Sequence, residues 1–201
     1  MIEGAAPAVN DKSDDERPVR NFDRRKALEN TKWNVYLDHI RTDQGVEVRN
    51  YMVVEPKIRL DGKVSGVAVL PVIDAKLILR RAYRYPLEQY FWEIPRGFVE
   101  PGETSEYSAL RELSEEAGMI CAPEDLRFLG SVAPEASTLA GMVDIFVALK
   151  CRPGGTRDMQ EPGLGDCHVF TVNQAREMIM SNEVSESHTQ IAVCRYLLAM
   201  N

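Results

Sequence analysis

A run of acidic residues between two glycines constrains the fold of this chain more than any other feature. Residues 97–119 read GFVEPGETSEYSALRELSEEAGM. Thr104 is a suitable N-cap and Gly118 suits the left-handed C-cap position, so the run predicts a helix between them. At about 100° per residue, Leu110, Leu113 and Ala117 share one side of this helix. We expect this apolar side to pack on a sheet and the acidic side to face outward.

The acidic side of the expected helix carries Glu112, Glu115 and Glu116. Solvation is the ordinary explanation of a charged face, but Glu112 and Glu116 are like charges at i,i+4, which costs roughly 0.2–0.5 kcal/mol. Arg111 is the only basic residue within the run. A hard divalent cation explains the cluster better, because Mg²⁺ takes oxygen ligands and bridges carboxylates to substrate phosphates. The tight loop before the helix can add a main-chain carbonyl and Glu103. The sequence therefore predicts a Mg²⁺ site, with Mn²⁺ as an alternative.

Composition limits the other roles of the chain. Its 201 residues are 44% hydrophobic and 27% charged, with a net charge of -7. This balance is typical of a globular protein and disfavours binding to a nucleic-acid backbone. No apolar run approaches the roughly 20 residues that span a bilayer, and the N-terminus lacks the pattern of a secretory signal. The cysteines are scattered without metal-type spacing. We expect a cytoplasmic protein that binds neither nucleic acid nor membrane.

Strand-like segments precede and follow the acidic run. We expect a flexible tail over residues 1–24, a β-rich segment over 25–58 and the main domain over 59–201. Strand patterns at 33–40, 46–55, 64–73, 76–85, 90–95, 126–133, 141–151 and 168–172 alternate with few helices. A helix over residues 188–200 would place Ile191, Cys194, Leu197 and Leu198 on its apolar face. The fold class is α/β or α+β with a mixed sheet.

The acidic run resembles the signature of the Nudix hydrolases, which is G, five residues, E, seven residues and R-E-U-x-E-E-x-G-U, where U is apolar. Every fixed position is met, by Gly97, Glu103, Arg111, Glu112, Leu113, Glu115, Glu116, Gly118 and Met119. The resemblance implies an α/β/α sandwich that hydrolyses a nucleoside diphosphate linked to another group. It assigns Glu112 and Glu116 as main metal ligands, with Glu115 and the main-chain carbonyl of Arg96 as further ones.

The remaining motif residues have supporting or open roles. Glu103 and Arg111 are expected to form an internal ion pair, with direct metal ligation as the alternative. The general base lies within the helix, which makes Glu115 a candidate, or on a later loop, where Glu135 and Glu161 are candidates. Each loop acid is equally well explained as a solvated side chain.

A weaker resemblance covers residues 29–56 and 66–103 and points to the ADP-ribose and sugar-nucleotide pyrophosphatase branch. It implies a homodimer formed through the N-terminal β segment, with Arg84 contacting the substrate and Trp33 stacking on a base across the dimer. A solvated arginine and a buried tryptophan are the alternatives. Pro134 favours ADP-ribose, although the branch usually has a small residue in place of Arg96. GDP-mannose, dinucleoside polyphosphates, a coenzyme and a non-catalytic nucleotide sensor remain alternatives.

Overall fold

The computed structural model describes residues 17–157 and 162–199. The chain divides into two compact units, Met1–Glu55 and Pro56–Asn201. Their helices and strands, in chain order, are β1 (Val19–Glu29), β2 (Trp33–Thr42), β3 (Glu47–Pro56), β4 (Val64–Ile73), β5 (Lys76–Arg84), β6 (Gln89–Glu93), β7 (Arg96–Phe98), α1 (Ser105–Ala117), β8 (Met119–Ile120), β9 (Leu126–Val132), β10 (Met142–Ala148), β11 (Arg152–Pro153), β12 (Leu164–Thr171), α2 (Val172–Met180) and α3 (Ser187–Ala199).

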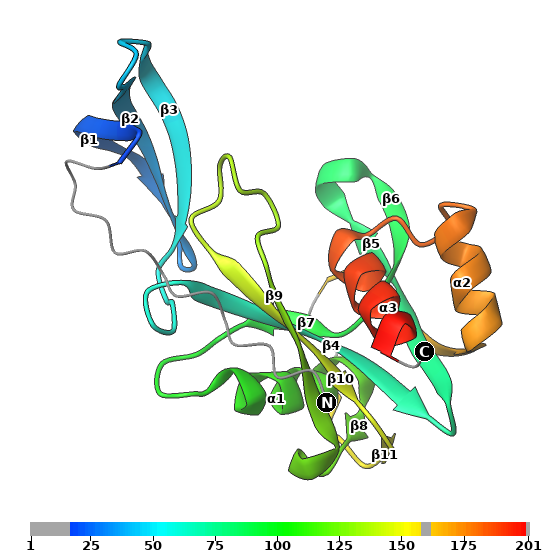
Figure 1. The fold of residues 1–201 in the computed structure, drawn as a ribbon. Helices are drawn as coiled ribbons and strands as arrows, with labels where there is room; N and C mark the ends of the chain where they lie inside the picture. The colour runs from blue at the N-terminus through cyan, green and yellow to red at the C-terminus, as the bar shows by residue number, and fades with distance from the viewer. Residues whose placement is uncertain (1–16, 158–161, 200–201) are drawn as a thin grey trace. The chain divides into compact units, whose positions relative to one another are not determined.

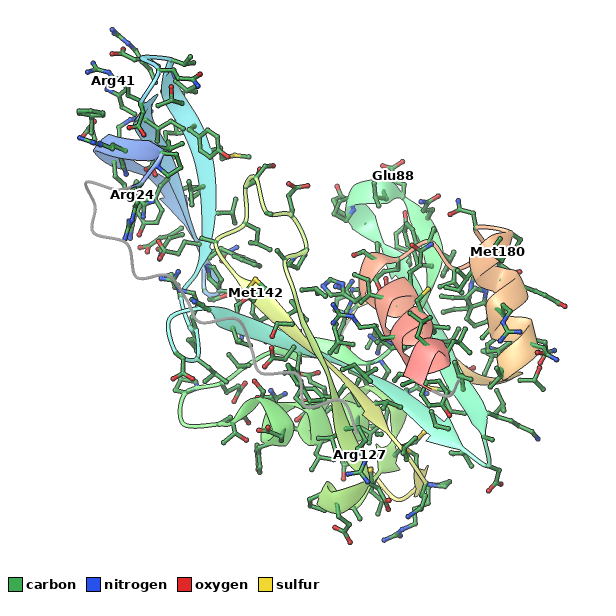
Figure 2. The ribbon with its side chains drawn as sticks, in the orientation of Figure 1. Arg24, Arg41, Glu88, Arg127, Met142 and Met180 are labelled. Carbon is green, nitrogen blue, oxygen red and sulfur yellow. The ribbon has the colours of Figure 1, made fainter. Side chains whose placement is uncertain are left out.

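The first unit is a three-stranded sheet in the order β1-β2-β3. We expected a flexible tail over residues 1–24. This was wrong for residues 19–24, because β1 begins at Val19 and pairs antiparallel with β2. Polar contacts hold this pairing: Arg24 donates to the buried Asp38 of β2 at 2.9 and 2.8 Å and covers the Tyr36 ring. Arg24 and Arg41 both belong to this sheet (Figure 2).

The second unit is built on a mixed sheet in the order β12-β5-β4-β10-β9. Strands β4 and β10 run parallel, and β10 with β9 and β12 with β5 run antiparallel. Two short strands join the sheet beside this path, where β6 pairs with β5 and β7 pairs with β4. Helix α1 lies on one face of the sheet, and α2 and α3 lie on the other (Figure 1). The expected α/β/α sandwich is confirmed.

Two apolar clusters form the core, one on each face of the sheet. Val67 and Val69 of β4 join Leu113 of α1 in the first cluster. Ala68 and Leu70 of β4 join residues of α2 and α3 in the second. Because successive residues of a strand point to opposite faces, β4 is apolar on both and reads as one continuous run.

The core face of helix α3 matches the expected apolar face only in part, because Ile191 and Leu197 pack against the core but Cys194 and Leu198 do not. Its buried residues are His188, Thr189, Ala192, Val193 and Tyr196. Leu198 and Cys194 are exposed, whereas Thr189 is buried and accepts a hydrogen bond from the main-chain N–H of Ile94 at 3.1 Å. Among the described residues, no helix has the length and apolar character needed to cross a membrane.

Candidate active site

Helix α1 has the two caps that its sequence predicts. The Thr104 hydroxyl accepts a hydrogen bond from the N–H of Tyr107 at 3.2 Å. Gly118 ends the helix at φ 66°, a left-handed conformation that favours glycine. These caps fix the rotation and length of α1, and so the positions of its glutamates.

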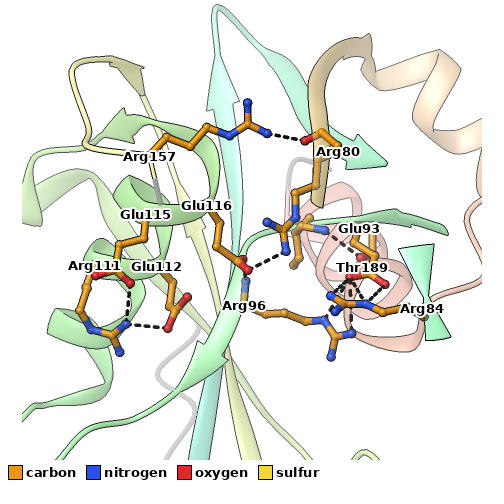
Figure 3. A network of polar contacts seen from close by, with 12 residues as sticks. Arg80, Arg84, Glu93, Arg96, Arg111, Glu112, Glu115, Glu116, Arg157 and Thr189 are labelled. Carbon is orange, nitrogen blue, oxygen red and sulfur yellow. Dashed lines mark hydrogen bonds and ion pairs between the residues drawn. The ribbon is translucent and has the colours of Figure 1, made fainter. Parts of the chain in front are cut away.

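The acidic face of α1 is turned inward, which corrects our expectation that it faces solvent. Glu112 and Glu116 are buried, whereas Glu115 remains 43% exposed. Burying a carboxylate is costly unless it is paired and hydrogen-bonded. Arginines and main-chain N–H groups supply these partners (Figure 3).

Arg111 joins the glutamates of the motif to one another. Its Nε donates to Glu103 at 3.0 Å, which is the expected ion pair. Its Nη1 donates to Glu112 at 2.7 Å and to Glu115 at 3.0 Å, and its Nη2 donates to the carbonyl of Phe98 at 2.9 Å. Burial alone would lower the pKa of Arg111, but the bonds to Glu103 and Glu112 raise it above the usual value. Arg111 therefore keeps its charge and fixes the loop against the helix.

Arg80 of β5 is the partner of Glu116 and was not found by sequence reasoning. Its side chain is 0% exposed, and its Nη2 donates to Glu116 Oε1 at 2.7 Å. Its Nε and Nη1 are buried and have no hydrogen-bond partner among the described residues. An arginine in the strand KLILRRAYR is ordinarily an outward-facing residue, so only the burial of β5 on both faces reveals this contact.

Strand β7, which precedes α1, is shaped around the carboxylates. A Cβ on Gly97 would overlap the carboxylate of Glu112, so only glycine allows this close approach. The N–H of Arg96 donates to Glu116 Oε2 at 2.5 Å. The carbonyl of Pro95 and the N–H of Val99 form hydrogen bonds with β4. Because hydrogen-bonded and non-hydrogen-bonded residues alternate along an antiparallel strand, the N–H and carbonyl of Arg96 both point away from β4. The Arg96 carbonyl is thus turned to the side on which Glu116 lies.

These residues fit a hard divalent cation in chemistry but are not assembled around one. Carboxylates and a main-chain carbonyl are the oxygen donors that Mg²⁺ uses, and Gly97 leaves room for them. Within the described ranges, however, no group of three or more His, Cys, Asp or Glu side chains converges in a metal-binding arrangement. The glutamates are bound to Arg80 and Arg111 instead.

The alternative to a substrate contact for Arg84 was a solvated arginine at a strand end. Arg84 instead forms an ion pair. Its Nε and Nη2 donate to the Glu93 carboxylate at 2.9 and 2.5 Å. Glu93 itself is fully buried at the end of β6. We did not predict Glu93 as a site residue from the sequence. Its position directly before the residues IPRG, which lead into the motif, could have indicated it.

The other predicted residues belong to other elements or lie outside the described residues. Glu135 is exposed in the turn after β9, and its carboxylate accepts hydrogen bonds from the N–H and hydroxyl of Ser137. These bonds hold the pKa of Glu135 below its usual range. Glu161 lies outside the described residues. Trp33 is the first residue of β2, in the N-terminal unit.

A cavity of about 590 Å³ lies beside the exposed end of the glutamate cluster. Its lining combines residues of α1 with two from the segment after β11: Tyr107, Leu110, Arg111, Ser114, Glu115, Thr156 and Arg157. Glu115 thus borders both the cluster and this cavity.

Comparison with known proteins identifies this arrangement. The model of the NUDIX domain matches residues 62–189, which include every motif residue described above. The chain belongs to the Nudix hydrolase family. Nudix hydrolases generally use divalent metal ions, in agreement with the oxygen-rich donor set of α1.

Two curated relatives and one solved structure resemble this Nudix hydrolase over most of its length. The ADP-ribose pyrophosphatase of Bacillus subtilis (strain 168) is 28% identical over 162 residues, covering 80% of this chain and 82% of that protein. The methanol dehydrogenase activator of Bacillus methanolicus is 33% identical over 141 residues, covering 68% and 72%. The crystal structure of an ADP compounds hydrolase shares the fold, with a TM-score of 0.76, 20% identity and coverage of 92% and 95%.

Proposed function

We propose that this Nudix hydrolase cleaves the diphosphate bond of ADP-ribose or a related nucleoside diphosphate sugar in a Mg²⁺-dependent reaction. The products are a nucleoside monophosphate and a sugar phosphate. The intact set of Glu112, Glu115 and Glu116, held by Arg80 and Arg111, carries this proposal. The relative named ADP-ribose pyrophosphatase supports the substrate class.

We assign roles according to the position of each group. Glu112, Glu116 and the Arg96 carbonyl would hold the cation, and Glu115 either completes its shell or takes the proton. A bound divalent cation neutralises phosphate oxygens and lowers the pKa of water. The oxygen of water attacks one phosphorus, the bond from that phosphorus to the bridging oxygen breaks, and a carboxylate takes the proton. Glu115, Glu135 and Glu161 remain the candidates for this carboxylate, and the lowered pKa of Glu135 makes it a weaker base than an ordinary glutamate.

We also propose a cytoplasmic homodimer formed through the N-terminal sheet. Val48 and Met52 are exposed and lie four residues apart in β3, hence on one face. A second copy of the chain would cover these apolar side chains and bring Trp33 to the partner's substrate. The four cysteines are free, as expected in a reducing compartment.

The proposed activity is tested by incubating the purified protein with ADP-ribose and Mg²⁺ and identifying the products. AMP and ribose 5-phosphate should form with Mg²⁺ and not with EDTA. Glu112→Gln should abolish turnover while the protein remains folded. An equal rate in EDTA, or in the folded E112Q variant, would contradict the assignment of the metal site.

A further inference from the structure

A buried carboxylate beside the motif holds two arginines. Glu93 is fully buried, and Arg84 from β5 and Arg96 from β7 both approach its Oε2 (Figure 3). Arg84 Nη2 lies 2.5 Å from this oxygen. Arg96 Nε and Nη2 each lie 3.4 Å from it. Two guanidinium groups therefore converge on a single oxygen atom.

The two arginines use this carboxylate unequally. The bonds of Arg84 are short, whereas 3.4 Å is long for a hydrogen bond from N–H to oxygen, for which about 2.9 Å is usual. Arg96 is 28% exposed and Arg84 is 25% exposed, while the carboxylate between them is not exposed. Within the described residues, the guanidinium of Arg96 makes no other hydrogen bond or ion pair. Its planar set of donors is therefore available to an oxyanion.

A second carboxylate near Arg96 does not take up these donors. The charge of Arg96 lowers the pKa of Glu186, so the two lie close enough to interact. The oxygens of Glu186 already accept bonds from His188 Nδ1 at 2.6 Å and from the N–H and hydroxyl of Thr189 at 2.9 and 2.8 Å. Glu186 thus attracts Arg96 without a hydrogen bond to it.

The main chain of Arg96 fixes the point at which its side chain begins. Its N–H is bonded to Glu116 Oε2 at 2.5 Å, so the side chain begins directly beside a proposed metal ligand. The Arg96 side chain therefore begins beside Glu116 and ends beside Glu93, where the Arg84 guanidinium also binds. Arginine binds phosphate through paired, charge-assisted hydrogen bonds.

We propose that Arg84 and Arg96, held by Glu93, form a two-arginine receptor for a phosphoryl group of the substrate, in which the Arg96 side chain is a specificity-determining residue. The inference rests on the proposed function, because the group bound is part of the substrate diphosphate. Glu93 is a positioning residue that acts through the two arginines.

Calorimetric titration with ADP-ribose in EDTA, where no turnover occurs, tests the receptor. Arg96→Ala removes the side chain but keeps the main-chain N–H that binds Glu116. It should weaken binding about tenfold or more, because a hydrogen bond to a charged group is worth roughly that factor. Arg96→Lys should recover part of the loss. Arg127→Ala, at an exposed arginine of β9 (Figure 2), should bind as the wild type does. Equal affinity of the R96A variant and the wild type would overturn the receptor.

Inorganic pyrophosphate separates this proposal from the proposed function. If the wild type neither binds nor hydrolyses ADP-ribose, the substrate assignment is wrong, but the receptor still predicts pyrophosphate binding that R96A weakens. If the wild type hydrolyses ADP-ribose and R96A binds both ligands normally, the receptor is wrong and the function stands. Failure of the wild type to bind pyrophosphate in EDTA would also overturn the receptor.

Discussion

Glu112 and Glu116 have similar proposed roles but different surroundings. Glu116 is the only hydrogen-bond partner that the described residues give to the Arg80 side chain, which is fully buried. Arg111, the partner of Glu112, also binds Glu103 and Glu115. Loss of charge at the two positions should therefore affect stability differently.

We predict that Glu116→Gln lowers the free energy of unfolding by about 3–5 kcal/mol, because it leaves the Arg80 charge buried without a counter-ion. Glu112→Gln should cost less than about 1 kcal/mol, because Arg111 keeps other partners. Both should lower kcat by roughly 100-fold or more, as expected when several kcal/mol of charge stabilisation are lost. Urea unfolding and steady-state kinetics measure these effects. Equal loss of stability in the two variants would contradict the role given to Arg80.

Glu186 predicts a pH dependence of stability. Burial would raise its pKa, but the hydrogen bond from His188 and the charge of Arg96 lower it from 4.5 to about 2. Since the folded-state pKa is the lower one, Glu186 stabilises the fold above about pH 4.5, and this contribution is lost as the pH falls towards about 2. At pH 7, Glu186→Gln should lower the free energy of unfolding by about 3 kcal/mol, at about 1.4 kcal/mol per pKa unit.

The check on this prediction is urea unfolding of the wild type and the E186Q variant between pH 7 and pH 3. The difference between them should stay constant down to about pH 4.5 and shrink below it. A difference that is constant over the whole range would show that the Glu186 charge does not contribute.

The sequence predicted the glutamates of the site and their partner Arg111, but not Arg80, which binds Glu116. Glu112, Glu115 and Glu116 follow from helical spacing alone, and so does their common face. Arg80 could not be recognised, because its burial depends on β12 and β6 flanking β5 on both edges. The shared use of Glu93 by Arg84 and Arg96 joins three different strands, and local spacing carries no information on such contacts.

At the scale of the elements, Gly97 of β7 lies very close to the Glu112 side chain of α1, whose end is flexible. A Cβ on Gly97 would meet the end of the Glu112 side chain, which can move aside. We predict that Gly97→Ala lowers kcat/KM strongly, because it displaces the Glu112 carboxylate, while the free energy of unfolding falls by about 1 kcal/mol or less.

Gly155 provides the matched comparison. A Cβ there would lie 2.8 Å from main-chain atoms of Gly118, Met119 and Ser114, which cannot move separately. Gly155→Ala should therefore cost about 1–3 kcal/mol of stability. Thermal unfolding and kinetics of both variants provide the check. A normal kcat/KM in the G97A variant would contradict the claim that position 97 must be glycine to leave room for the Glu112 carboxylate.

Strands buried on both faces were the elements most readily predicted. The apolar runs of β4 and β5 match the expected residues 64–73 and 76–85 almost to the residue. Strand β1 was missed because it is rich in charged residues and is held by contacts such as Arg24 with Asp38. The core face of α3 was predicted only in part, because the buried polar residue Thr189, which bonds to the main chain at Ile94, has no signal in an apolar pattern.

At the scale of the whole molecule, we predict a homodimer that depends on the N-terminal sheet. Sedimentation at micromolar concentration should give a dimer for the wild type. Met52→Asp should give a monomer, because it places a charge on the exposed apolar face of β3. Val169→Asp, at an exposed valine of β12, should leave the dimer intact. A monomeric wild type with full activity would contradict the proposed dimer.

The most direct test of the central claim is kcat/KM for ADP-ribose, measured with Mg²⁺ beside GDP-mannose, UDP-glucose and diadenosine polyphosphates. The acidic helix, its arginine partners and the ADP-ribose pyrophosphatase relative together predict that ADP-ribose ranks first and yields AMP and ribose 5-phosphate. A rank well below another member of the panel would contradict the substrate. No hydrolysis of any diphosphate in the panel would contradict the proposed activity itself.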